Sequence, residues 1–264
     1  MINIAITAEK GIPKEKLEWL SKKTSLPLLS PKIQADYCLN ITTDYLELRK
    51  ILLSDNKKKA KVESIHIDFV TGKSKHRRLQ GGGKGQDIAK AIGLHKIKNP
   101  TVLDLTAGMG GDAFVLASLG AEMTLVERNP IVHALLDDAI ERIKLSADNE
   151  LQDIVKRMIL INKPALDVLE KIENDNRPDV IYIDPMFPER TKSAQVKKEM
   201  QFFHDIVGND SDSEALLLKA INLANKRIVV KRPRLAKKLT EAFQTDFTIS
   251  GKSTRYDIYL PKHD

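Results

Sequence analysis

The chain of 264 residues has a single cysteine, Cys38, so it cannot form a disulfide within itself. Its six histidines show no spacing typical of a metal site, and we predict that the protein binds no metal. No stretch reaches the roughly 18 consecutive apolar residues that a membrane-spanning helix needs. The first residues also lack the long apolar run of a secretory signal. These absences lead us to expect a cytoplasmic protein without a membrane segment.

Hydrophobic residues make up 42% of the chain, which suffices for a packed core and excludes a disordered chain. The length suits one large α/β domain, or a core domain of about 170–190 residues with a smaller domain attached. We place a small α/β domain at residues 1–80 and the core domain at 81–264. For the small domain, the pattern predicts strands at 2–7, 37–42 and 64–70, a helix at 13–23, and a helix or extended turn at 45–53.

In the core domain, strands alternate with helices, which is typical of a parallel sheet covered on both faces. We predict strands at 101–105, 122–127, 158–162, 179–184 and 227–232, and helices at 112–119, 130–145 and 165–173. The segments FTIS (247–250) and YDIYL (256–260) predict a closing antiparallel hairpin. The fold class is therefore α/β, with a mostly parallel seven-stranded sheet and helices on both faces.

The net charge is +7, and the basic residues are concentrated in two stretches. Residues 57–98 contain ten Lys and two Arg against three acidic residues, and residues 226–238 contain seven Lys or Arg and no acid. Such concentrations are typical of a surface that binds a polyanion, although each stretch alone also fits an ordinary solvated surface.

The first motif that carries chemistry is DLTAGMGGD (Asp104–Asp112), between a predicted strand and a predicted helix. Gly108 and Gly110 let the backbone turn tightly and approach a ligand. Acids at both ends, Asp104 and Asp112, favour a cationic ligand such as S-adenosylmethionine over the pyrophosphate of a nicotinamide cofactor.

An acid also ends the next predicted strand. Glu127 stands where doubly wound folds place the acceptor for ribose hydroxyls. Its neighbour Arg128 either lines the adenine side of the cofactor or forms a surface salt bridge.

A second motif, DPMFP (Asp184–Pro188), ends another predicted strand. Ligands bind at the carboxyl ends of parallel strands, so this segment should face the same crevice as the glycines. Asp184 and Phe187 each precede a proline, which keeps the segment extended. The Asp184 carboxylate and main-chain carbonyls near Pro185 can then accept the hydrogens of an amine, while Phe187 stacks on a base. We therefore assign Asp184, Pro185 and Phe187 to methylation of an exocyclic base amine.

These motifs resemble class I methyltransferases with the Asp/Asn-Pro-Pro-aromatic signature of amino methylation. Further segments make the chain similar, over about residues 45–260, to the small-subunit ribosomal RNA guanine 2-amino methyltransferase family called RsmJ. They are YLELRK (45–50), HRR with GGGKGQ (76–86), GDAFVLASLG (111–120), ERNP (127–130) with ALLDD (134–138), VKKEM (196–200) and VVKRP (229–233).

The resemblance implies a Rossmann-like fold and methyl transfer from S-adenosylmethionine to a guanine 2-amino group in small-subunit (16S) ribosomal RNA. The substrate would be the RNA itself or an assembling 30S particle. The implied cofactor contacts are Gly111–Asp112, Glu127–Arg128, Pro164–Ala165 and Asp184. The chain departs from the pattern at Thr106, where many methyltransferases have the first glycine, and at Met186, which replaces the second proline.

Basic residues near the crevice are expected to contact RNA phosphates. Arg77, Arg78 and Lys84 lie in the segment 76–86, which we interpret as a flexible basic loop that orders against RNA. A solvated linker between the two domains fits the same segment. The other candidates are Lys197, Lys198, Lys231 and Arg232.

Other functions fit parts of the pattern. An amino methyltransferase acting on adenine or on DNA would use the same DPMFP chemistry and differ only in substrate. A non-catalytic RNA-binding assembly factor would keep the fold without binding S-adenosylmethionine. A nicotinamide dehydrogenase would bind NAD, which the acids around the glycine turn disfavour. The sequence predicts no particular oligomeric state.

Overall fold

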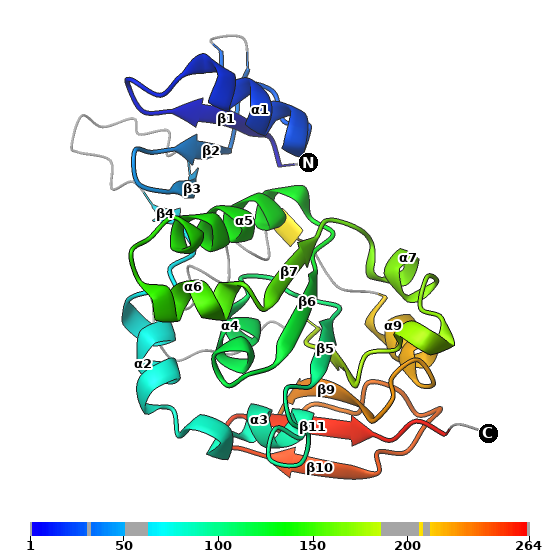
Figure 1. Ribbon diagram of the computed structural model, residues 1–264. Coiled ribbons are helices and arrows are strands. Elements are labelled where there is room, and N and C mark those ends of the chain that lie inside the picture. Colours follow the sequence, from blue (N-terminus) through cyan, green and yellow to red (C-terminus); the bar gives the residue numbers. More distant parts are fainter. Residues whose placement is uncertain (1, 31–32, 51–62, 186–205, 208–211, 263–264) are drawn as a thin grey trace.

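The computed structural model describes residues 2–30, 33–50, 63–185, 206–207 and 212–262. A small sheet at one end of the molecule adjoins a large sheet that has helices on both faces (Figure 1). None of the helices in these segments is both long and apolar enough to cross a membrane.

The small sheet has the strand order β1-β2-β3-β4. Its strands are β1 (Ile4–Ala8), β2 (Tyr37–Ile41), β3 (Leu46–Lys50) and β4 (Ser64–Ile65), and helix α1 (Lys14–Thr24) follows β1. β1 and β2 run parallel, and the other neighbours run antiparallel.

Two predictions for this region were wrong in part. The segment 45–53 was predicted as a helix or extended turn, but residues 46–50 form strand β3, because alternate Leu46 and Leu48 are buried while the backbone pairs with β2. Residues 51–53 lie outside the described chain. The strand predicted at 64–70 ends at Ile65. Beyond it, the Asp68 carboxylate accepts the backbone N–H of Val70 at 2.7 Å and turns the chain.

The large sheet has the order β10-β11-β9-β8-β5-β6-β7 and confirms the predicted seven strands. The strands are β5 (Thr101–Asp104), β6 (Glu122–Val126), β7 (Met158–Ile161), β8 (Val180–Ile183), β9 (Arg227–Pro233), β10 (Phe247–Ser250) and β11 (Thr254–Tyr259). β5 to β9 pair in parallel, and β10 and β11 form the predicted antiparallel hairpin. All of β8 is buried, as expected of a strand covered on both faces.

Helices cover both faces of this sheet. One face carries α3 (Asp87–Ile92), α4 (Gly111–Ser118), α5 (Pro130–Lys144) and α6 (Asn149–Val155). The other carries α7 (Ala165–Leu169) and α9 (Ser213–Ala220). Neighbouring strand residues alternate between the two cores: Tyr182 packs with the first set and Ile181 with the second. Helix α7 is shorter than the predicted 165–173, and α3, α6 and α9 were not predicted.

The segment interpreted as a flexible basic loop is largely helical. Residues Gly72–Gln80 form helix α2, which packs against α4, and Gly83–Gly85 form the short 3₁₀ helix η1. A second 3₁₀ helix, η2 (Asn174–Asn176), follows α7 later in the chain. The loop prediction failed because Arg77, Arg78, Leu79 and Gln80 are good helix formers and the helix packs against α4, whereas the glycines that suggested a loop begin only at Gly81.

Helix α5 joins the small sheet to the large one. Asp138 of α5 accepts the backbone N–H of Leu46 at 3.1 Å, and Lys23 forms an ion pair with Asp137. The buried apolar cluster on this side runs from Ile6 and Leu39 of the small sheet to the core of the large sheet. The two sheets therefore share one hydrophobic core.

Candidate active site

The predicted crevice forms at the carboxyl ends of β5, β6, β8 and β9. The chain runs from β5 outward to β7, then returns to β8 on the opposite side of β5. In open α/β sheets such a reversal leaves a crevice for a ligand. Asp104 at the end of β5 and Asp184 just after β8 stand on either side of this reversal.

The glycine turn between β5 and α4 depends on left-handed backbone. Gly108 and Gly110 have φ angles of 53° and 70°, which residues with a Cβ rarely adopt. Gly110 is the N-cap of α4, and a Cβ there would stand 2.7 Å from Cδ1 of Leu136 in α5. Glycine at this position thus allows the turn to pack directly against α5, and Gly111 begins α4.

Glu127 ties the glycine turn to the end of β6. Its side chain is buried, and its two carboxylate oxygens accept the backbone N–H groups of Gly108 at 3.0 Å and Asn129 at 2.7 Å. Asn129 in turn caps the N-terminus of α5 by accepting the N–H of Ile131. The Glu127 carboxylate is therefore fixed beside the glycine turn, and its role as a ribose acceptor stays a prediction.

A pocket lies beside Glu127, and several of the predicted cofactor residues line it. It is lined by Leu105, Thr106, Gly108, Val126, Glu127, Arg128, Ala165, Val207, Asp212 and Leu216. Arg128 forms an ion pair with Asp212 at 2.8 Å, so the salt-bridge alternative holds while Arg128 also faces the pocket. Pro164 is exposed and precedes the buried Ala165 as the N-cap of α7.

Asp112 and Asp184 meet through a shared lysine. The ammonium of Lys231 in β9 lies 2.9 Å from Asp112 and 2.7 Å from Asp184. The register of β8 and β9 pairs Ile183 with Val230, which places the following residues, Asp184 and Lys231, side by side. Arg77 of α2 forms a second ion pair with Asp112.

These cations control the charge of Asp112. Burial alone would raise the pKa of its carboxyl, but Lys231 and Arg77 outweigh burial and hold that pKa well below its usual range. Burial would lower the pKa of Lys231, but Asp184 and Asp112 raise it above its usual range. Tyr182 donates its hydroxyl to Asp112 at 2.7 Å, and its own pKa is raised by burial and by the nearby carboxylates. All three groups therefore keep their ordinary charges at neutral pH.

Asp104 behaves differently. Its side chain is buried, and burial raises its pKa to about 8 although the N–H of Thr106 donates to it at 3.0 Å. The Asp104 carboxyl is therefore largely protonated at neutral pH.

Thr106 has a role that the sequence did not suggest. Its hydroxyl accepts the backbone N–H of Asp184 at 2.7 Å, which links the ends of β5 and β8. In the sequence, Thr106 stood out only as a departure from a glycine pattern, but a hydroxyl there supplies the acceptor that a glycine lacks. Tyr182, Asn129 and Asp212 were not predicted either. Asn129 could have been found, because Asn directly before a proline is a typical helix N-cap, whereas nothing in the local sequence marks Tyr182 or Asp212.

The predicted RNA contacts divide into exposed and inward-facing residues. Lys84 is exposed on η1. Arg77 and Arg78 face the protein, where they pair with Asp112 and Glu150. Lys231 is held between the carboxylates of Asp112 and Asp184, and its contact with RNA stays a prediction.

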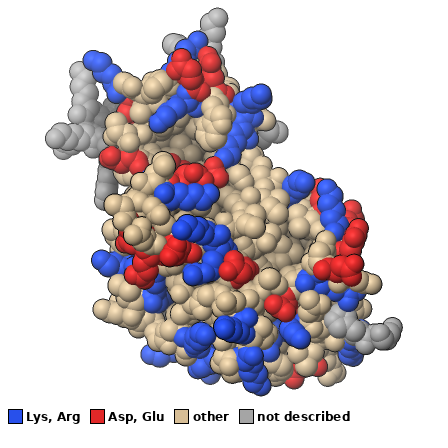
Figure 2. Space-filling model, viewed as in Figure 1, with Lys and Arg blue, Asp and Glu red and all other residues tan. Residues whose placement is uncertain are grey.

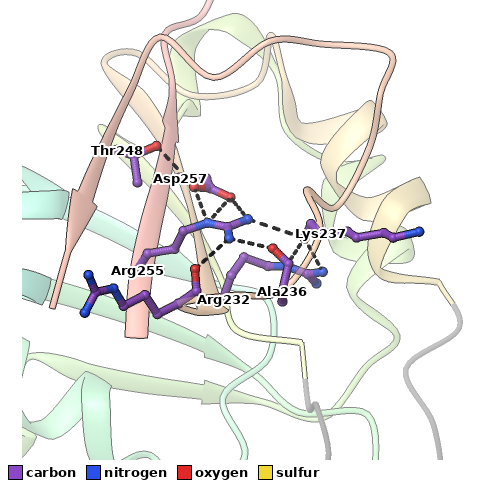
Figure 3. A network of polar contacts seen from close by, with 7 residues as sticks. Arg232, Ala236, Lys237, Thr248, Arg255 and Asp257 are labelled. Atoms are coloured by element: carbon purple, nitrogen blue, oxygen red, sulfur yellow. Dashed lines mark hydrogen bonds and ion pairs between the residues drawn. The ribbon is translucent and has the colours of Figure 1, made fainter. Parts of the chain in front are cut away.

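The prediction for Arg232 is corrected, because this side chain is buried and faces the protein interior. Its Nη2 donates to the carbonyl of Lys237 at 2.7 Å (Figure 3). Arg255 reaches the same loop, donating to Ala236 and Lys237 while it pairs with the buried Asp257. Arg232 thus helps to fix the loop after β9 instead of contacting RNA.

Three predicted residues, Phe187, Lys197 and Lys198, lie outside the described residues, whereas Pro185 is described and buried. In the part of the chain that the structure describes, no three His, Cys, Asp or Glu side chains are placed to hold a metal ion.

Comparison with known proteins shows the family of the chain. A family model described as "Putative SAM-dependent methyltransferase" matches residues 20–261. Ribosomal RNA small subunit methyltransferase J of Pseudomonas syringae pv. syringae is 44% identical over 96% of this chain and 89% of its own length. The protein of the same name from Aeromonas salmonicida is 47% identical over 92% and 96%.

A solved structure has the same fold. The crystal structure of a SAM-dependent methyltransferase from Neisseria gonorrhoeae superimposes with a TM-score of 0.73 at 34% identity, covering 97% of this chain and 96% of that chain.

Proposed function

Because the chain belongs to the ribosomal RNA small subunit methyltransferase J family, we propose that it methylates the 2-amino group of a guanine in small-subunit ribosomal RNA. The methyl donor is S-adenosylmethionine. The observation that carries the proposal is the Asp184 carboxylate, fixed by Lys231 and Thr106 at the crevice that also holds the glycine turn.

The residues at the crevice fit the cofactor. The pocket beside Glu127 offers a buried carboxylate for ribose hydroxyls, next to apolar side chains and the backbone of the glycine turn. Asp112 already balances two cations, so we assign it to organising the site. Asp104 is the last residue of β5, just before the turn, and a cationic group that approaches its carboxyl would lower the raised pKa. The cofactor supplies an electrophilic methyl group on a sulfonium sulfur.

The protein's part in the reaction is to hold and orient the amine. The 2-amino group of guanine is a weak nucleophile because its lone pair is delocalised into the ring. A hydrogen bond from that amine to the Asp184 carboxylate favours attack and stabilises the positive charge that develops on nitrogen. The ammonium of Lys231 donates to this carboxylate at 2.7 Å and fixes its direction. After transfer the nitrogen loses one proton, to Asp184 or to water, and Phe187 is assigned to stack on the base.

Recognition of the RNA extends beyond the crevice. We propose that residues 1–80 take part in it and that Lys84, Lys197 and Lys198 contact phosphates. The substrate is the RNA itself or an assembling 30S particle, which places the reaction in the cytoplasm.

The test uses small-subunit ribosomal RNA from cells that lack this gene, both naked and as subunits. Purified protein and methyl-labelled S-adenosylmethionine are added, and the labelled nucleoside is identified. We expect guanosine methylated on its 2-amino group. Label in adenosine would refute the guanine assignment, and bound cofactor with no label on either substrate would favour the assembly-factor alternative.

Variants of Asp184 test its role. We expect Asp184→Ala to lower kcat by about 10²–10⁴, the usual contribution of a positioned acid–base group. Asp184→Asn keeps an acceptor oxygen without charge and should retain more activity. The exposed Asp153→Ala is the control and should leave kcat unchanged. Near-normal turnover by Asp184→Ala would refute the role of this carboxylate.

A further inference from the structure

A second pocket lies away from the crevice and brings the two basic stretches of the sequence together. It is lined by Lys84, Lys90, His95, Lys96, Arg227, Phe247 and Ile249. Arg227 begins β9, whereas Lys231 near the end of that strand contacts Asp184. Four residues of a strand span about 13 Å, so the pocket lies about that far from the crevice along β9.

Arg227 at this pocket is a half-buried cation without an acidic partner among the described residues. Its Nη1 donates to the carbonyl of Ala91 at 3.1 Å, but its buried Nε has no hydrogen-bond partner in the described chain. Burial lowers the pKa of its guanidinium, and no carboxylate in the described segments offsets that effect. Partly buried charges in proteins are normally paired, so this arrangement favours an external anion.

The surroundings hold the Arg227 guanidinium in place. The Cζ atom of Arg227 stands 5.9 Å from the ring centroid of Phe247. A Cβ on Gly93 would come within 2.9 Å of the same Cζ atom. Gly93, with a φ of +83°, thus leaves just enough room for the guanidinium. Phe247 itself is 41% exposed, so one part of its ring remains open to a ligand.

The charge around the pocket is strongly positive. Lys84, Lys90 and Lys96 are all exposed on its rim, and the ion pair of Lys90 with Asp87 is loose at 3.7 Å. Figure 2 shows basic side chains gathered on the lower part of the molecule, where Figure 1 places α3 and the β10–β11 hairpin. Fields of several cations concentrate a polyanion at such a surface.

We infer that this pocket binds a phosphate of the ribosomal RNA substrate outside the target nucleotide, with a neighbouring base stacked on Phe247. The Arg227 guanidinium can donate two hydrogen bonds to one phosphate, and an aromatic ring accepts any base. Single-stranded RNA segments are recognised by this combination of stacking and phosphate contacts. The inference rests on the proposed function for the identity of the RNA.

The salt dependence of RNA binding tests this inference. The probe is unmodified small-subunit ribosomal RNA, titrated with purified protein over a series of salt concentrations. Lys90→Ala/Lys96→Ala and Arg227→Gln should each reduce the slope of log affinity against log salt, by roughly 0.7–0.9 for each phosphate that the variant no longer neutralises. Phe247→Ala should weaken binding roughly five- to hundredfold with little change in slope.

The matched control is Lys156→Ala/Lys171→Ala, which removes two exposed lysines elsewhere and should leave the slope unchanged. Melting temperature and S-adenosylmethionine binding show whether each variant is folded. If Arg227→Gln does not fold, the variant Lys90→Ala/Lys96→Ala, which changes only exposed residues, tests the inference. An unchanged slope in folded Lys90→Ala/Lys96→Ala, or the same change in the control, would overturn the inference. Failure of the proposed function would appear separately, as wild-type protein that places no label on guanine.

Discussion

At the scale of single residues, the crevice contains acids whose charge states differ because their neighbours differ. Asp112 is surrounded by Lys231, Arg77 and the Tyr182 hydroxyl, and stays ionised. Asp104 is also buried, but it accepts the backbone N–H of Thr106 in place of such cations, so its pKa rises to about 8. The same residue type therefore serves as a fixed anion at one position and as a titratable group at another.

The raised pKa of Asp104 predicts a pH-dependent stability. The folded pKa of about 8 lies above the unfolded value of about 3.9, so the folded protein binds more protons between pH 5 and 8. This group's contribution to the free energy of unfolding then falls as pH rises, by at most about 1.4 kcal/mol per pH unit. The Asn side chain does not titrate, so the stability of Asp104→Asn relative to wild type should increase from pH 5 to 8. Urea unfolding at each pH measures the difference; Asp153→Asn should show none.

Lys231 is predicted to position Asp184 through charge. Lys231→Met should reduce methyl transfer at pH 7 at least about tenfold, because the carboxylates it joins lose their shared cation. Lys231 lowers the pKa of Asp112, so without that cation the pKa of Asp112 rises and the acidic limb of the kcat profile should move to higher pH. Lys231→Arg keeps the positive charge and should restore part of the rate and part of the pH profile. A uniform loss of rate with an unshifted profile would instead indicate a purely structural role.

At the scale of elements, strand–turn–helix units position the site. The turn before α4 was predictable, because glycines after an apolar strand mark a tight approach to a ligand or to another element. Strand β3 was not predictable, because YLELRK fits a helix by composition and becomes a strand only through pairing with β2. Helix α2 likewise depends on packing against α4.

Gly110 and Gly111 provide a matched test of the turn. Gly110→Ala forces a Cβ into left-handed backbone and to within 2.7 Å of Leu136, and should cost about 2–4 kcal/mol of stability. Gly111→Ala meets nothing within 4 Å and should be neutral or slightly stabilising. Urea unfolding of both variants measures the contrast. Equal stability of the two would show that the turn is not constrained as described.

At the scale of the whole molecule, the two sheets behave as one unit in this structure. Helix α5 contacts the small sheet through Asp137 and Asp138 on one side and covers the large sheet on the other. A continuous buried core across both sheets predicts that neither unfolds alone.

The single tryptophan makes that prediction testable. Trp19 lies in helix α1, which follows β1 of the small sheet, so its fluorescence reports on the region of the small sheet alone. We expect the urea transition by Trp19 fluorescence to coincide with the transition by far-ultraviolet circular dichroism, which reports on all helices. A tryptophan transition at clearly lower urea would mean that the small sheet unfolds independently.

The sequence by itself determined the alternation of strands and helices, the glycine turn, and the acids that end β5, β6 and β8. These features are local, because periodicity, glycine and proline act within a few residues of themselves. Tertiary structure alone decided which cations face inward. Lys231 and Arg232 looked alike in the sequence, but strand alternation and the register with β8 placed one beside Asp184 and buried the other under the loop after β9. The same long-range packing brought Arg227 beside Phe247 and the lysines around α3, which no local pattern specifies.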